Sequence, residues 1–305
     1  MKRITRLFLT AAVVLFAGSL FAQDMTQAGE LYQKGTEAYQ AGNEMEAVKN
    51  FKEALKIAEA AGDDGVEMAQ GCKDMIPQIL LSAAGKMVAA KDYAKAEETY
   101  TEALNTAKEY GNDAVASSAQ AKLAQIPLQQ GNDAYNAGNI EEAIPFFQKA
   151  IERDANNAKA HLLLGMACNK AGKDAEAEAS LMKAKELGDA NAEKVLSGMF
   201  VSSANDAMKA KKFTEAIAKA EKALALGPNP TASLIAGMSA YQAKNWNKAI
   251  THLVNAPASA QNTYILASCY ESAGKKAQAC ATYKKVLGDG KFGPTAKQKI
   301  AKLGC

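Results

Sequence analysis

The sequence predicts an all-α protein assembled from tandem helical hairpins. Three observations support this fold class. One residue pattern recurs along most of the chain, each copy contains a two-residue turn at a fixed place, and Ala is abundant while Val, Ile and aromatic residues are modest in number. Because Ala favours helices whereas β-branched and aromatic residues favour strands, this composition favours helices. With 305 residues, 48% hydrophobic and 23% charged, the chain has the composition of an ordinary soluble globular protein.

Residues 1–22 are predicted to be a secretory signal peptide. Three basic residues precede an uncharged apolar run over residues 7–17, and small residues follow, which is the three-part organisation of such a segment. Cleavage is expected after Ala22, with cleavage after Ser19 as the alternative. The apolar run is shorter than the roughly 20 residues that span a bilayer, so an uncleaved anchor is the less favoured interpretation. No Cys lies near the cleavage region, which argues against a lipoprotein.

An exported chain of this kind is predicted to lie in the periplasm or cell envelope and not to be an integral membrane protein. Residues 1–22 contain three of the 36 Lys and Arg residues and none of the 33 Asp and Glu residues, so the rest of the chain has no net formal charge. Nucleic acid is therefore not a predicted partner, because its binding commonly relies on a net basic field. The Lys-rich segment 209–222 also contains Glu215 and Glu221 and is interpreted as a solvated helix face.

The recurring pattern is an Ala, a large apolar residue four positions later and a small residue three positions after that, all on one face of a helix. The clearest copies are Ala47/Phe51/Ala54, Ala96/Tyr100/Ala103 and Ala143/Phe147/Ala150, and weaker copies begin at Ala177, Ala216, Ala249 and Ala279. Another small residue lies twelve positions before each first Ala, at Gly35, Ala84, Gly131, Gly165, Ala204, Gly237 and Ala267. The turn pairs between them are Gly42-Asn43, Lys91-Asp92, Gly138-Asn139, Gly172-Lys173, Lys211-Lys212, Lys244-Asn245 and Gly274-Lys275. Each unit is therefore predicted to be a helix, a tight turn and a second helix, with small residues where the two helices cross.

This unit resembles the tetratricopeptide repeat. Residues 131–157 resemble it best, because the family's residue types occur at Gly131, Tyr135, Gly138, Ala143, Phe147 and Ala150. The resemblance extends over about seven tandem copies and implies a right-handed α–α superhelix, the tetratricopeptide solenoid, over residues 24–290. The copies are predicted near residues 28–61, 77–110, 124–157, 158–191, 197–229, 230–259 and 260–290.

The first copies depart from the family spacing, because about 14 extra residues fall in each of the first two gaps between leading Ala residues. These segments, 60–73 and 110–122, are predicted to lengthen the helices of the first two copies. After the seventh copy, Pro294 begins an amphipathic segment, and residues 294–305 are predicted to form a C-terminal capping helix.

No arrangement of residues predicts catalysis or a bound metal or cofactor. The two histidines, His161 and His252, have no Cys, Asp or second His at ligand spacing. The sequence contains no HExxH, GxxxxGK[ST] or GxSxG motif. The chain is therefore predicted not to be an enzyme and to need no cofactor.

The five cysteines allow a disulfide in an oxidising compartment. Cys269 and Cys280 lie at similar distances on either side of the last predicted turn, so a bond across this hairpin is one hypothesis. A bond between Cys280 and Cys305 is the other, and the sequence leaves both open. Cys72 and Cys168 are interpreted as small apolar residues on buried helix faces.

The resemblance to the tetratricopeptide repeat implies that the first helix of each copy lines a concave groove. Carried over position by position, the groove gives eight candidate partner-binding residues: Tyr39, Asn132, Tyr135, Asn136, Asn169, Asn205, Met208 and Tyr241. Amides can hydrogen-bond a peptide backbone, and Tyr and Met supply adaptable contact area. The family's carboxylate clamp requires Lys at the fifth position of a repeat. No copy has Lys there, so that function is not predicted.

The predicted function is a non-catalytic scaffold or adaptor that binds a peptide or partner protein in this groove, by analogy with exported tetratricopeptide proteins of Gram-negative envelopes. A carrier or sensor that binds a small molecule or glycan in the same groove is the alternative. That alternative requires a deep pocket with convergent polar groups and a ligand that co-purifies. An enzyme is disfavoured, because no nucleophile, base or metal-ligand set converges and the repeats leave no residues over for a second, catalytic domain.

Overall fold

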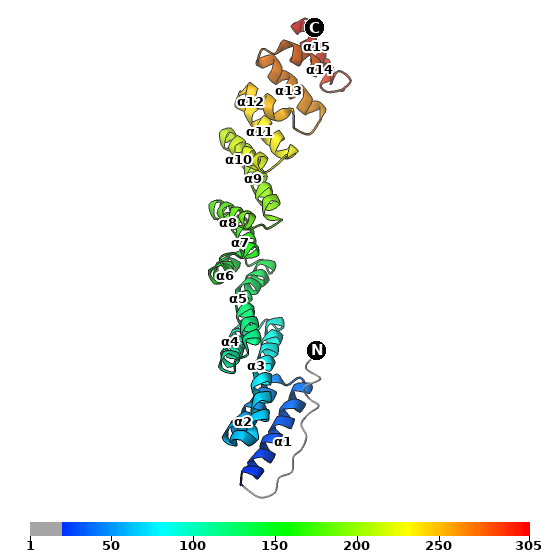
Figure 1. The fold of residues 1–305 in the computed structure, drawn as a ribbon. Coiled ribbons are helices and arrows are strands. Elements are labelled where there is room, and N and C mark those ends of the chain that lie inside the picture. Colours follow the sequence, from blue (N-terminus) through cyan, green and yellow to red (C-terminus); the bar gives the residue numbers. More distant parts are fainter. Residues whose placement is uncertain (1–19) are drawn as a thin grey trace. The chain divides into compact units, whose positions relative to one another are not determined.

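A computed structural model describes residues 20–305, with side chains from residue 24 onward. Every regular element in this part of the chain is a helix (Figure 1), so the predicted all-α fold class is confirmed. The chain divides into two compact units, one up to Gln130 and one from Gly131 to Cys305, and the division falls inside helix α5 (Asp113–Asn136). Residues 1–19 of the predicted signal peptide lie outside the described residues.

The first unit contains two complete hairpins and most of α5. Helix α1 (Leu20–Gln40) pairs with α2 (Glu44–Ala60), and α3 (Val66–Ala89) pairs with α4 (Tyr93–Glu109). The short 3-10 helix η2 (Gly62–Gly65) connects the hairpins, and α2 also packs against α3. Since the two hairpins share this contact, they bury one continuous core, which includes Phe51, Leu55, Cys72, Ile76 and Leu80.

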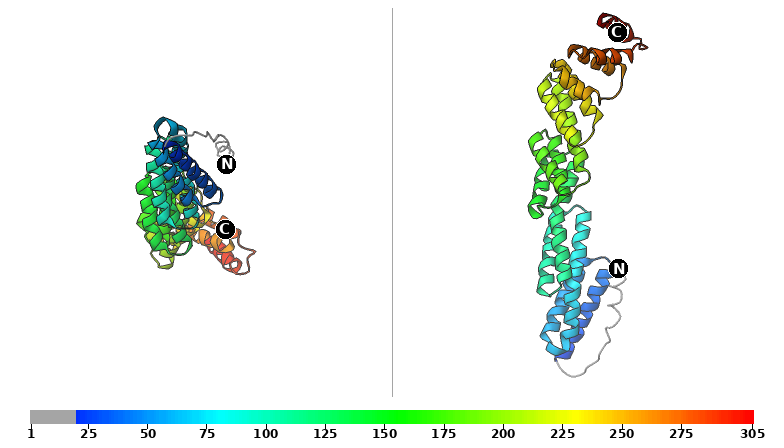
Figure 2. Two further views of the ribbon diagram at one scale, coloured as in Figure 1. Left: turned by 90° about the horizontal axis from the view of Figure 1, so that it is seen from below. Right: turned by 45° about the horizontal axis from the view of Figure 1, so that its top comes forward.

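The second unit continues from the end of α5 through four further hairpins to a final helix. Its helices are α6 (Ile140–Arg153), α7 (Ala158–Lys170), α8 (Asp174–Glu186), α9 (Ala192–Lys209), α10 (Phe213–Ala225), α11 (Pro230–Gln242), α12 (Trp246–Leu253), α13 (Ala260–Ser272), α14 (Lys276–Lys284) and α15 (Gly293–Leu303). Helices that follow one another in the chain pack side by side (Figure 2). Each hairpin therefore contributes one first helix and one second helix to a row of repeats.

The turns of the hairpins follow from local residue chemistry. The first residue of every predicted turn pair has a positive φ: Gly42, Lys91, Gly138, Gly172, Lys211, Lys244 and Gly274. This left-handed residue ends the first helix. An Asp or Asn then caps the second helix at two of these turns, because Asp92 accepts a hydrogen bond from the Lys95 amide at 3.4 Å and Asn245 accepts one from the Lys248 amide at 3.2 Å.

Glycines lie where the helices of a hairpin cross, opposite large apolar residues. A Cβ added at Gly165 would lie 2.6 Å from Cγ of Leu181 and 3.1 Å from its backbone nitrogen, and Gly237 has the same relation to Leu253. Leu181 is fully buried. The missing side chain thus sets the distance between the two helices, and the large residue fills the space beside it.

The extra residues of the first copies are largely helical, as predicted, but they lengthen helices of the second and third copies and not of the first and second. They open the first helices of the second and third hairpins, so α3 and α5 each have 24 residues. The preceding helices end earlier, because Gly62 and Gly111 adopt positive φ values of 61° and 74°. Both long helices continue through an internal proline, Pro77 and Pro127, which are fully buried. Burial in the core offsets the backbone hydrogen bond that each proline removes.

The structure forms a disulfide between Cys280 and Cys305, so the predicted pairing of Cys269 with Cys280 is wrong. Cys269 is a free, buried thiol that packs against residues of α11 and α12, whereas Ala267 packs against α14 and α15. Two positions along a helix differ by about 200°. Cys269 therefore lies on the face of α13 that is turned away from Cys280.

Helix α15 is held at the end of the second unit by the disulfide and by a polar link. Glu271 of α13 accepts a hydrogen bond from the Tyr283 hydroxyl of α14 at 2.7 Å and forms an ion pair with Lys299 of α15 at 3.0 Å. Partial burial raises the pKa of Glu271, but the hydrogen bonds from Tyr283 and Lys299 together lower the pKa by more, so the net shift is downward.

We expect Cys305→Ser to lower the free energy of unfolding by about 3 kcal/mol, because the cross-link spans 25 residues of sequence and restricts the unfolded chain. Urea unfolding followed by circular dichroism measures this loss, and hydrogen exchange should show the largest loss of protection in α15. With dithiothreitol present, wild type and variant should become equally stable, which serves as the control.

A thiol count tests the same pairing independently. Burial raises the pKa of Cys72 to about 12 and that of Cys269 to about 11, so these thiols should resist iodoacetamide in the native protein. After unfolding without a reductant, three thiols should react: Cys72, Cys168 and Cys269. Five reactive thiols under those conditions would contradict the disulfide.

Candidate functional site

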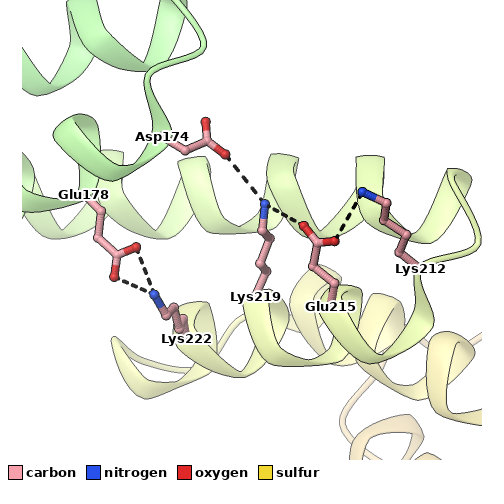
Figure 3. A network of polar contacts seen from close by, with 6 residues as sticks. All are labelled: Asp174, Glu178, Lys212, Glu215, Lys219 and Lys222. Carbon is pink, nitrogen blue, oxygen red and sulfur yellow. Dashed lines mark hydrogen bonds and ion pairs between the residues drawn. The ribbon is translucent and has the colours of Figure 1, made fainter.

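Ion pairs link the second helices α8 and α10 of neighbouring hairpins (Figure 3). Lys222 of α10 donates to both carboxylate oxygens of Glu178 of α8, at 2.6 and 2.9 Å. Lys219 lies 3.6 Å from Asp174 of α8 and 3.2 Å from Glu215 of its own helix. The hydrogen bond from Lys219 is the largest of the effects that lower the pKa of Glu215. The charges of this surface are thus largely paired with one another.

The same kind of pairing continues between other second helices of this unit. Glu221 of α10 contacts Lys248 at 3.0 Å and His252 at 3.1 Å, both from α12. Burial raises the pKa of Glu221, but the hydrogen bonds from Lys248 and His252 together lower the pKa by more, so the net shift is downward. Lys173, which precedes α8, pairs with Glu141 of α6 at 3.3 Å. Because the lysines face carboxylates, these helices do not present the uncompensated basic stripe that binds phosphates.

The first helices have a different surface, and all eight predicted partner-binding residues lie on them. Tyr39 is on α1 in the first unit, and the second unit carries Asn132, Tyr135 and Asn136 on α5, Asn169 on α7, Asn205 and Met208 on α9, and Tyr241 on α11. Asn136 and Asn169 are exposed and the others are half-buried. None of the four Asn side chains has a hydrogen-bond partner among the described residues. Their amides are therefore available to donate to and accept from another chain.

Tyr135 and Lys170 connect two successive first helices. The ammonium nitrogen of Lys170, at the end of α7, lies 4.4 Å from the centre of the Tyr135 ring of α5, which is a cation–π contact. Asn136 and Asn169 are the sequence neighbours of these two residues. The contact therefore brings the last turns of α5 and α7 together, and each of these turns carries one exposed amide.

The rings of Tyr241 and Tyr39 pack partly against core residues. The Tyr241 ring packs edge to face against Trp246 at a centroid distance of 5.9 Å, and Tyr39 packs against the core cluster that contains Phe51. Only the outer part of each ring can meet a partner. The structure does not test whether any of the eight residues binds one, so their role stays a prediction.

Two hollows open on the first unit. The larger, of about 600 Å³, lies where the turn before α2 meets α3 and the turn before α4. Its lysines are already paired, Lys86 with Glu44 and Lys95 with Asp92. Because the positive charges of these lysines are already balanced by carboxylates, we do not expect this hollow to bind a charged ligand.

The smaller hollow, of about 420 Å³, is lined by residues of α3, α4 and α5. It is lined by Gly85, Val88, Ala89, Tyr100, Lys122, Gln125 and Gln129. None of these residues was among the predicted candidates. Lys122 was missed because residues 110–122 were assigned to the first two copies and not to α5. The signal that could have revealed the hollow is the pair of small residues Gly85 and Ala89, which occupy groove positions of the second copy.

The described residues offer no evident metal site or membrane span. Within residues 20–305, no three His, Cys, Asp or Glu side chains are grouped so that they could hold a metal ion. In that same range, no helix combines the length and the apolar character that crossing a bilayer requires.

Tandem hairpins with ion-paired second helices and unpartnered amides on the first helices define an α-helical repeat protein. Residues 128–192 and 202–262 match the tetratricopeptide repeat family, which supports the family predicted from the sequence. Proteins of this family are generally protein-interaction scaffolds without catalytic activity.

Several solved tetratricopeptide structures are similar to the chain. A protein from Parabacteroides merdae ATCC 43184 has 14% identity and a TM-score of 0.28, covering 92% of this chain and 100% of its own. The TPR2AB domain of yeast Sti1, in a complex with pHSP90, has 14% identity and a TM-score of 0.36, covering 91% and 97%. YrrB, a protein with an unusual peptide-binding site, has 20% identity and a TM-score of 0.35, covering 57% and 92%. At TM-scores this low these similarities carry no functional argument. No curated protein matches the chain.

Proposed function

We propose that this protein is an exported, non-catalytic scaffold that binds an extended peptide or a partner protein along the first helices of its second unit. The observation that carries the proposal is the state of the predicted groove residues. The second helices α8, α10 and α12 pair their charges with one another, whereas Asn132, Asn136, Asn169 and Asn205 on the first helices have no hydrogen-bond partner among the described residues.

A face of this kind suits an extended chain. The backbone of an extended peptide offers donors and acceptors in alternation, and a carboxamide can satisfy either. The Tyr135–Lys170 contact adds an aromatic surface with a cation held over it, and Tyr residues often dominate binding energy at protein interfaces. Unpartnered Asn side chains lie on the successive first helices α5, α7 and α9, so a longer partner can gain affinity from several weak contacts in one chain.

Two observations support a periplasmic or envelope location. Residues 1–22 have the composition of a signal peptide. The disulfide between Cys280 and Cys305 belongs to an oxidising compartment, since the cytosol keeps most thiols reduced.

In-cell photo-crosslinking tests the binding face. A photoreactive amino acid at Asn136 or Asn169 should form an adduct with one or a few envelope proteins. The same amino acid at Gln148 of α6 or Asn247 of α12, which are exposed positions on second helices, should form none. The variant Tyr135→Ala/Asn136→Ala/Tyr241→Ala should reduce the adduct from Asn169 about tenfold or more, because it removes aromatic contacts that hot spots favour.

Two outcomes would contradict the proposal. Equal adducts from the first-helix and second-helix positions would show that the face is not selective. An undiminished adduct in a triple variant that still folds, judged by circular dichroism, would show that the residues do not bind. A small molecule that co-purifies in native mass spectrometry, with no protein adduct, would instead favour the carrier or sensor alternative.

A further inference from the structure

The C-terminal end of the second unit is strongly basic, unlike the rest of the chain. Residues 275–305 contain eight lysines and a single acidic side chain, whereas residues 23–274 contain 25 Lys and Arg residues against 32 Asp and Glu residues. Seven of the eight lysines are exposed: Lys275, Lys276, Lys284, Lys285, Lys291, Lys297 and Lys302. None of these seven forms an ion pair within the described part of the chain, and only the eighth, Lys299, pairs with Glu271. The positive charge of this end is therefore uncompensated, in contrast to the charges of α8, α10 and α12.

The one carboxylate of this segment is used by the loop that carries it. Asp289 lies in the loop between α14 and α15, and its Oδ1 accepts hydrogen bonds from the backbone amides of Lys291 at 2.9 Å and Phe292 at 2.8 Å. The Phe292 ring packs on the Tyr264 ring of α13 at a centroid distance of 5.3 Å. These contacts order the loop, and Asp289 pairs with none of the lysine side chains around it.

This ordered loop exposes an apolar residue between lysines. Leu287 is 44% exposed, and no other large hydrophobic residue of residues 260–305 is exposed to that degree. Lys284 and Lys285 precede it in the chain. Lys291 follows it, with its ammonium nitrogen 5.3 Å from the centre of the Phe292 ring. Three ammonium groups without a counter-ion therefore come from within four positions of an exposed leucine.

We propose that residues 284–292 dock on the surface of a membrane that contains anionic phospholipid. Lys284, Lys285 and Lys291 contact the headgroup phosphates, and Leu287 enters the boundary between the headgroups and the acyl chains. The four other exposed lysines lie on or beside α14 and α15 and add to the attraction. The protein is held at the membrane without spanning it.

The mixture of residues favours a lipid surface over a protein or a nucleic acid. Lys is depleted at protein–protein interfaces, whose centres contain clusters of aromatic and other apolar residues, whereas here one leucine is exposed among lysines. A nucleic acid offers phosphates but no apolar layer that would receive the leucine. An anionic membrane offers both, with the apolar layer directly beneath the phosphates. This contact is independent of the peptide-binding face on the first helices, so it goes beyond the proposed function.

Sedimentation with vesicles tests the proposal. The chain used starts at Gln23, because the basic and apolar residues 1–22 would themselves bind anionic vesicles. The probes are vesicles of phosphatidylcholine alone and vesicles of equal parts of phosphatidylcholine and phosphatidylglycerol. At low salt the protein should sediment with the anionic vesicles and not with phosphatidylcholine. Molar salt should release it, because dissolved ions screen the lysine charges.

Matched variants locate the charge. Lys284→Gln/Lys285→Gln/Lys291→Gln should weaken binding to the anionic vesicles about a hundredfold, because each lysine near such a surface contributes about a factor of five. Lys49→Gln/Lys52→Gln/Lys56→Gln removes the same charge from three exposed positions of α2. It should leave binding within about twofold of wild type, since only charges close to the membrane contribute. Circular dichroism checks that both variants fold.

A fluorescent reporter tests the contact of the loop itself. The emission of Leu287→Trp should shift to shorter wavelength when anionic vesicles are added, and brominated acyl chains should quench it. The unsubstituted protein is measured in parallel to subtract the signal of Trp246, which packs against Tyr241.

The proposal is overturned if phosphatidylcholine binds the protein as well as the anionic vesicles do, or if the triple variant of the loop binds as wild type. It is also overturned if the reporter emission stays unchanged while the protein sediments. Binding to polyglutamate or DNA in place of vesicles would overturn it as well, and would indicate an acidic protein or a nucleic acid as the partner. If the photo-crosslink at Asn169 is retained while anionic vesicles do not bind, the peptide-binding scaffold stands and the membrane contact fails.

Discussion

Replacing both Gly165 and Gly237 with Ala should lower the free energy of unfolding by about 4 kcal/mol, roughly 2 kcal/mol at each site. A Cβ at either position would lie 2.6 Å from Cγ of the facing leucine and 3.1 Å from its backbone nitrogen. The leucine cannot relieve the contact by moving its far end alone, so the two helices of the hairpin must separate. This overpacking exceeds the gain of about 1 kcal/mol that Ala contributes over Gly to a helix interior.

Gly198→Ala is the matched control for this prediction. Gly198 lies inside α9, and no atom lies within 4 Å of the Cβ that would be added. The substitution should raise stability by up to about 1 kcal/mol through helix propensity alone. Urea unfolding of the three single variants measures both effects. If Gly165→Ala proved as favourable as Gly198→Ala, the packing role of the crossing glycines would be wrong.

Phe147→Ala should lower the free energy of unfolding by about 3–5 kcal/mol, because it removes a fully buried aromatic ring and leaves a cavity. Phe147 lies opposite Gly131, where an added Cβ would come within 2.6 Å of the ring. The gap left by Ala cannot be filled by a glycine across from it. Because each repeat packs mainly on its neighbours, hydrogen exchange should lose protection first around α6.

The adjacent residue supplies the control. Phe146 is half-buried, so Phe146→Ala removes less apolar surface from contact and should cost less than half as much. Unfolding in urea, with circular dichroism as the signal, compares the two variants, which both remove the same side-chain atoms. Equal losses for Phe146 and Phe147 would contradict the assignment of Phe147 to the core.

Much of the fold could be predicted from local pattern. The turn residues Gly42 and Lys91 adopt the left-handed conformation at the predicted places, and Ala143, Phe147 and Ala150 are buried on one face of α6. These features depend on interactions within about sixteen residues, between two helices joined by a short turn. The repeated pattern therefore contains nearly all of the information that they need.

Less of the candidate site than of the fold could be predicted from the sequence. The first-helix positions of Asn136 and Asn169 follow from the repeat pattern, but the contact between Lys170 and Tyr135 and the hollow at Tyr100 depend on how separate hairpins meet. Lys122 and Gly85 are far apart in the sequence and share a site only because α3 and α5 are first helices of successive hairpins.

The sequence by itself determined the hairpin unit, its turns, its crossing glycines and its all-α class, because each of these results from contacts between residues close in the chain. Only the tertiary structure decided which helices the extra segments lengthen, which cysteine pairs with Cys280, and where unpartnered polar groups converge. Those outcomes depend on which face of a helix is covered by a neighbour. Cys269 of α13 is buried against α12, whereas Cys280 of α14 forms its disulfide with Cys305 after α15. The way these helices pack sets the direction of each cysteine side chain, and the spacing of the cysteines in the sequence does not reveal it.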